Sequence, residues 1–83
     1  MGKHGKVLAA VFTDPIRDNI KWRDIEAMLK HHGADISEAA GSRGRVVLGT
    51  VRAVFHRPHP RPTNDKGAVA SVRRLLEAAG VKP

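Results

Sequence analysis

Residues 43–56 decide the fold of this chain, and they read RGRVVLGTVRAVFH. Two apolar, β-branched runs, Arg45–Leu48 and Val51–His56, are separated by only a Gly-Thr pair. A two-residue loop that begins with glycine is typical of a type II′ turn, because that turn needs a positive φ at its first central residue. The sequence therefore predicts an antiparallel hairpin that turns at Gly49 and Thr50.

The predicted register sorts the side chains of this hairpin onto two faces. Directly opposed residues share a face of a sheet, and successive residues of a strand alternate between faces. One face is therefore predicted to be apolar and to pack on helices: Val46, Leu48, Val51, Ala53 and Phe55. The opposite face is predicted to carry the charge: Arg43, Arg45, Val47, Arg52, Val54 and His56. Alternation alone thus collects three arginines and a histidine on one surface.

Apolar residues recur at helical spacing in three segments outside the hairpin. They predict helices at residues 6–12, from about Trp22 to His32, and at roughly residues 66–79. A weaker strand at Asp35–Ala39 is expected to extend the hairpin to three strands. The predicted order is α-α-β-β-β-α, an α/β chain of the α+β kind whose three-stranded antiparallel sheet packs on helices.

Length and composition restrict the classes of protein that the chain can belong to. Its 83 residues predict one small domain, residues 1–83, with a thin core. The absence of cysteine excludes disulfides, thiolate zinc sites and a cysteine nucleophile. The apolar run Val7–Phe12 is too short for a signal sequence or a membrane span. We therefore expect a cytoplasmic protein without a membrane partner.

The positive charge of the chain lies in its second half. Fifteen basic and eight acidic residues give a formal net charge of +7, and the two kinds balance within residues 1–40. Residues 41–62 contain five arginines, two histidines and no acid. A stretch of one sign predicts a polyanionic partner, and nucleic acid is favoured over a membrane because no basic amphipathic helix accompanies it. A basic surface that serves only solubility remains the alternative.

Histidines are the candidates for acid–base chemistry on this basic stretch. Metal-free RNA cleavage needs a base for the 2′-hydroxyl, an acid for the leaving 5′-oxygen and cations around the phosphate. An imidazole can serve as acid or base near neutral pH, so His56 and His59 are the catalytic candidates, although histidines that only bind phosphate are commoner. No cysteine or carboxylate completes a set of metal ligands, so we expect no metal and no cofactor. Candidate phosphate-binding residues are the nearby arginines: Arg43, Arg45, Arg52, Arg57 and Arg61.

Over about residues 20–80 the chain resembles the HicA-type toxins of bacterial HicAB toxin–antitoxin pairs. The matching pieces are a helix that ends in glycine, a Gly-Ser turn, a strand, a His-Pro segment and a closing helix: Trp22–Gly33, Gly41-Ser42-Arg43, Val51–Phe55, Pro58-His59-Pro60 and Lys66–Gly80. The resemblance implies a fold like the double-stranded-RNA-binding domain and a metal-independent endoribonuclease, or mRNA interferase, that cleaves mRNA. It also implies inhibition by a HicB-like antitoxin that covers the active face. Residues 1–20 would then be an N-terminal helical extension.

One position departs from the family pattern. The catalytic histidine of the family follows Gly-Ser in the turn, where this chain has Arg43, and arginine keeps its proton at neutral pH. Three explanations remain open: His56, opposite Arg43 in the hairpin, supplies the imidazole; the chain only binds RNA; or position 43 was altered to permit expression. Gly41, Ser42 and Lys66 match the family and are assigned to phosphate binding. The alternatives to an enzyme are a non-catalytic RNA- or DNA-binding module and a basic protein-binding domain.

Overall fold

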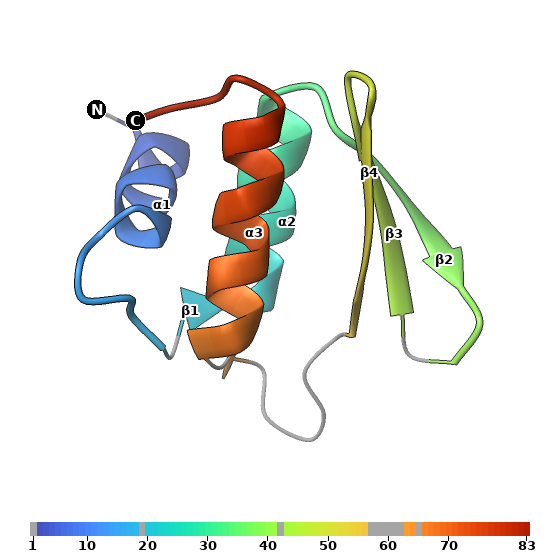
Figure 1. The fold of residues 1–83 in the computed structure, drawn as a ribbon, viewed down its shortest axis with the longest axis horizontal. Coiled ribbons are helices and arrows are strands. Elements are labelled where there is room, and N and C mark those ends of the chain that lie inside the picture. Colours follow the sequence, from blue (N-terminus) through green and yellow to red (C-terminus); the bar gives the residue numbers. More distant parts are fainter. Residues whose placement is uncertain (1, 19, 42, 57–62, 65) are drawn as a thin grey trace.

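A computed structural model of the chain describes residues 2–18, 20–41, 43–56, 63–64 and 66–83. It contains three helices and five strands in these segments, and Figure 1 labels most of them. In chain order they are α1 (Lys3–Val11), β1 (Ile20–Lys21), α2 (Trp22–His31), β2 (Asp35–Ala39), β3 (Arg43–Leu48), β4 (Val51–His56), β5 (Thr63–Asn64) and α3 (Lys66–Ala78).

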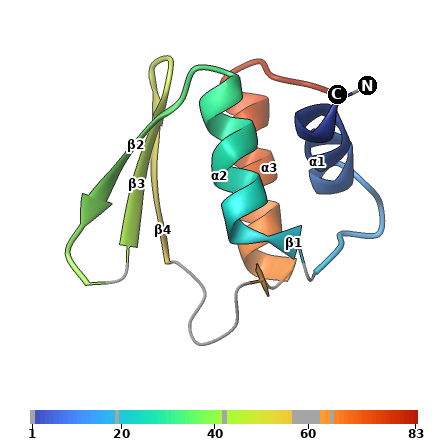
Figure 2. The same cartoon turned by 180° about the vertical axis from the view of Figure 1, so that it is seen from behind.

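The three helices and the larger sheet form three layers. The sheet of β2, β3 and β4 lies on one side, α2 and α3 lie in the middle, and α1 lies on the far side, as both views show (Figures 1 and 2). The predicted order of three helices and three long strands is confirmed, and the chain has an α+β fold. One face of the sheet is therefore covered by helices, and no helix or strand of the described segments covers the other.

The hairpin forms in the predicted register. β3 and β4 pair antiparallel, with Leu48 opposite Val51 and Arg43 opposite His56. Gly49 has a φ of 63°, the positive value that a hairpin turn of this length requires at its first central residue. The predicted third strand also forms, and β2 pairs antiparallel with β3 to give the order β2-β3-β4.

The buried side chains of β3 and β4 are those that the predicted strand alternation places on the apolar face. Val46, Leu48 and Phe55 are buried, and the rings of Phe55 and Trp22 lie 5.7 Å apart between centroids, which joins β4 to α2. Buried side chains from all three helices complete one core: Val7, Leu8, Val11, Trp22, Ile25, Met28, Leu29, Val69, Val72, Leu75 and Leu76. The apolar residues that recur at helical spacing in α2 and α3 thus face the core.

Two features differ from the sequence-based expectations. The first helix, expected at residues 6–12, begins at Lys3 and ends at Val11, because no proline in the residues after the extended Gly2 prevents the earlier start. A second, two-stranded sheet was not predicted: β1 and β5 pair antiparallel, with Ile20 opposite Asn64. This pair joins the segment before α2 to the segment before α3.

Replacing Gly49 by alanine should lower the free energy of unfolding by about 1 kcal/mol, because an L side chain is strained at a positive φ. A Cβ at this position would meet no atom within 4 Å, so backbone strain is the whole effect. Urea denaturation of the variant measures it. Gly49→Asn is the control, because asparagine also adds a side chain but tolerates a positive φ better than alanine does. Equal losses in both variants would contradict the turn geometry.

Candidate nucleic-acid interface

The open side of the three-stranded sheet gathers the basic residues of the hairpin. We call it the outer face and define it by register, since residues opposite one another share a face. Its three cross-strand rows consist of nine residues: Ala39, Arg43 and His56; Ser37, Arg45 and Val54; Asp35, Val47 and Arg52. The outer face therefore carries three arginines and one histidine on two adjacent strands.

These four basic side chains are all exposed, as the alternation predicts. Arg43 and His56 are opposed in the register at the end of the sheet where β3 begins and β4 ends. Arg45 and Arg52 lie in the next two rows, so each row holds one arginine. Side chains in neighbouring rows lie within about 7–8 Å, which is close enough for one strand of phosphates to meet several of them.

The remaining residues of the outer face are small, apolar or distant from the Arg43–His56 pair. Asp35 is the single carboxylate of the face and lies two rows away from that pair. Val54 is 52% exposed, and no other large hydrophobic side chain is exposed in the described residues. The outer face is thus predominantly positive, with one exposed apolar side chain near its centre.

The other sequence-predicted site residues do not all fall on the outer face. Gly41 lies in the turn between β2 and β3 with a φ of 70°, and Lys66 is the exposed first residue of α3. Both lie at the end of the molecule where β3 begins (Figure 1). Four of the predicted residues lie outside the described part of the chain: Ser42, Arg57, His59 and Arg61. The structure therefore brings together Arg43, Arg45, Arg52 and His56.

No group of three histidine, aspartate or glutamate side chains lies close enough together to hold a metal ion in the described segments. None of the helices in those segments is long and apolar enough to cross a membrane.

Residues 22–81 match the pattern of the HicA toxin of bacterial toxin–antitoxin systems. This chain belongs to the HicA toxin family. It is therefore a toxin of a toxin–antitoxin pair, and an antitoxin is its implied partner. The match begins at the first residue of α2, so α1 and β1 precede the region that the HicA family shares. No curated protein and no solved structure matched the chain.

Proposed function

We propose that this HicA toxin is an endoribonuclease that cleaves mRNA on the outer face of its sheet. The observation that carries the proposal is the opposition of Arg43 and His56 on an exposed surface that also holds Arg45 and Arg52. A cation and an imidazole on adjacent strands supply two of the groups that cleavage of a phosphodiester needs. The proposed substrate places this activity in the cytoplasm.

In the proposed reaction His56 moves the proton and the arginines hold the phosphate. The base removes the proton of a 2′-hydroxyl, and the 2′-oxygen attacks the adjacent phosphorus. The bond from phosphorus to the 5′-oxygen breaks, and an acid protonates that oxygen. The products are a 2′,3′-cyclic phosphate and a 5′-hydroxyl, and no metal takes part. His56 is one of the two proton carriers, and His59 is proposed as the other.

The arginines stabilise the charge that develops on the phosphate. Arg43, Arg45 and Arg52 are exposed and carry guanidinium groups, which form paired hydrogen bonds to phosphate oxygens. We assign Arg43 to the phosphate that is cleaved, because it lies opposite His56. The further phosphate-binding residues that we propose are Gly41, Ser42, Arg57, Arg61 and Lys66.

A non-catalytic RNA- or DNA-binding module is the second candidate function. Arg43 favours it. This arginine stands at the position of the catalytic histidine in the HicA pattern, and it can bind phosphate but cannot transfer a proton at neutral pH. This candidate uses the same outer face and the same arginines. It differs from the first in its outcome, because bound RNA stays intact.

Incubation of the purified chain with a defined transcript in the presence of a chelator separates the two candidates. Metal-independent cleavage predicts fragments that end in a 2′,3′-cyclic phosphate and begin with a 5′-hydroxyl. Stable complexes with intact RNA would contradict the enzyme and support the binding module. Absence of both RNA binding and cleavage would contradict the proposal and favour a basic domain that binds a protein. A HicB-like antitoxin is expected to inhibit cleavage in the same assay.

Salt dependence tests the number of phosphates that the outer face contacts. The logarithm of the RNA association constant should fall linearly with the logarithm of salt concentration. The slope should be about −4 for the six proposed cations on a single strand, and the three arginines of the outer face should contribute about half of it. Arg45→Gln should make this slope shallower by about 0.7. Fluorescence anisotropy at several salt concentrations measures both values. Lys82→Gln is the control, because this exposed lysine lies near the C-terminus and off the sheet. A slope near zero in the unchanged chain would contradict the arginine contacts.

A further inference from the structure

β4 is an edge strand of the larger sheet. The sheet order is β2-β3-β4, so β3 pairs with one side of β4, and no strand of the described segments pairs with the other. Val51 follows the two-residue turn and is opposite Leu48, so its peptide groups face β3. By alternation, the peptide groups of Arg52 and Val54 face the open edge. Such an edge is a template for another strand.

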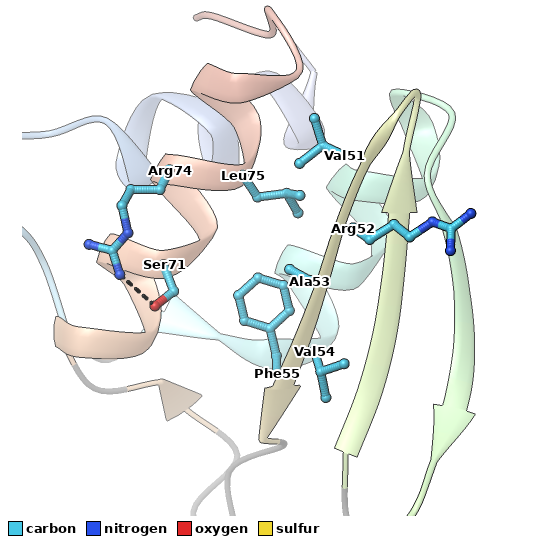
Figure 3. A pocket seen from close by; sticks show the side chains of 8 residues that line it. All are labelled: Val51, Arg52, Ala53, Val54, Phe55, Ser71, Arg74 and Leu75. Atoms are coloured by element: carbon cyan, nitrogen blue, oxygen red, sulfur yellow. Dashed lines mark hydrogen bonds between the residues drawn. The ribbon is translucent and has the colours of Figure 1, made fainter.

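A groove runs along this open edge between β4 and α3. It has a volume of about 350 Å³ and is lined by eight residues: Val51, Arg52, Ala53, Val54, Phe55, Ser71, Arg74 and Leu75. Val51, Phe55 and Leu75 point into the space between the strand and the helix (Figure 3). A groove with apolar side chains between an edge strand and a helix is a geometry in which domains bind an extended peptide as an added strand.

The charge of the groove indicates what kind of segment fits it. Arg52 points away on the outer face. Arg74 lines the groove from α3 with its guanidinium turned away from β4, and its Nη2 donates a hydrogen bond to Ser71 Oγ at 3.1 Å (Figure 3). None of the eight lining residues is acidic. A second copy of this chain would bring two molecules of charge +7 together along an edge that carries Arg52, which opposes self-pairing.

We propose that an extended acidic segment of a protein partner adds to β4 as a fourth strand of the sheet. Its apolar side chains fill the groove against Phe55 and Leu75, and its carboxylates lie on the opposite side of the added strand, beside Arg52. The positive charge of Arg74, which lines the groove, adds to the attraction for an acidic segment. Alternation of acidic and apolar residues satisfies both conditions, because successive side chains of a strand face opposite ways. The antitoxin that the HicA family implies is the partner to which we assign this segment. This docking edge of β4 lies beside the outer face. Peptide binding there is a role separate from the RNA binding proposed for the outer face.

The test uses the ¹⁵N-labelled full chain and a synthetic peptide, acetyl-TEVEVET-amide, with amide chemical shifts as the readout. The expected shifts gather on residues 51–55 and 71–75. Val54→Pro removes an edge-facing N–H and should abolish the shifts, whereas Val54→Thr keeps that N–H and should retain them. Arg74→Glu should weaken the peptide affinity about fivefold or more, while the matched reversal Lys82→Glu changes it less than twofold.

Four results would overturn the proposal. Shifts that gather on Arg43 and Arg45 would show a peptide bound as a polyanion on the outer face. An unchanged peptide affinity in Arg74→Glu would exclude the groove as the binding site. Arg74 is exposed, so this variant should fold and gives a result even if Val54→Pro does not fold. A dimer of the free chain that Val54→Pro disrupts would make a second copy the occupant. RNA binding by Arg74→Glu is measured in parallel: if it falls as much as peptide binding, the groove binds nucleic acid. Failure of RNA cleavage alone leaves the peptide result standing.

Discussion

His56→Ala is expected to lower the rate of RNA cleavage about 10²–10⁴-fold, the range typical of the loss of one proton-transfer group. His56 is exposed at the end of β4, so its removal opens no cavity and should leave the fold intact. RNA affinity should change less than about threefold, because the arginines of the outer face carry most of the attraction to phosphate. Single-turnover cleavage with saturating protein measures the chemical step apart from binding.

His32→Ala is the matched histidine control. His32 follows α2 at the end of the molecule opposite the Arg43–His56 pair, so its variant should cleave at the unchanged rate (Figure 1). Arg43→His provides a rescue, because it places an imidazole on the neighbouring strand, opposite position 56. In the His56→Ala background it should recover a large part of the lost rate. Cleavage by His56→Ala at the full rate would exclude His56 as a proton carrier.

The hairpin shows why the sheet and its basic face were predictable from the sequence. The position of Gly49 sets the turn, the turn sets the register, and the register assigns every side chain of β3 and β4 to a face. Arg43 and His56 are thirteen residues apart, yet their opposition follows from that one turn. Local sequence was sufficient because each of these steps depends on near neighbours in the chain.

The features that were not predicted depend on contacts between distant segments. β1 and β5 have two residues each, so they leave no periodic pattern, and their pairing depends on how the chain brings Ile20 near Asn64. The groove beside β4 depends on where α3 packs, and nothing in the spacing of Ser71 or Arg74 indicates a strand edge nearby. Such features need the tertiary structure, because the alternating and helical periods report only burial.

Arg73→Ala is expected to reduce the free energy of unfolding by about 2–3 kcal/mol. This is the typical loss when a charged donor is removed and its acceptors are left without that hydrogen bond. The Arg73 side chain is only 17% exposed and reaches from α3 to the end of α1. Its Nε donates to the Val11 carbonyl at 3.0 Å, its Nη2 donates to the Thr13 carbonyl at 2.7 Å, and its guanidinium lies 5.8 Å from the ring centroid of Phe12. Thermal unfolding followed by circular dichroism should show a Tm lower by roughly 10–20 °C.

The two carbonyl acceptors explain why the loss should be large although the ion pair of Arg73 is weak. Arg73 Nη1 lies 3.0 Å from the Asp14 carboxylate, but Asp14 is 79% exposed, so Asp14→Asn should cost less than about 1 kcal/mol. The last turn of α1 has no basic residue, and the guanidinium of Arg73 supplies the cation that a helix C-terminus favours. Arg73→Lys keeps the charge but not the planar fork, so it should recover only part of the stability. Arg74→Ala, its exposed neighbour, should unfold at almost the unchanged temperature. Equal Tm values for Arg73→Ala and Arg74→Ala would show that α1 is held by its apolar face alone.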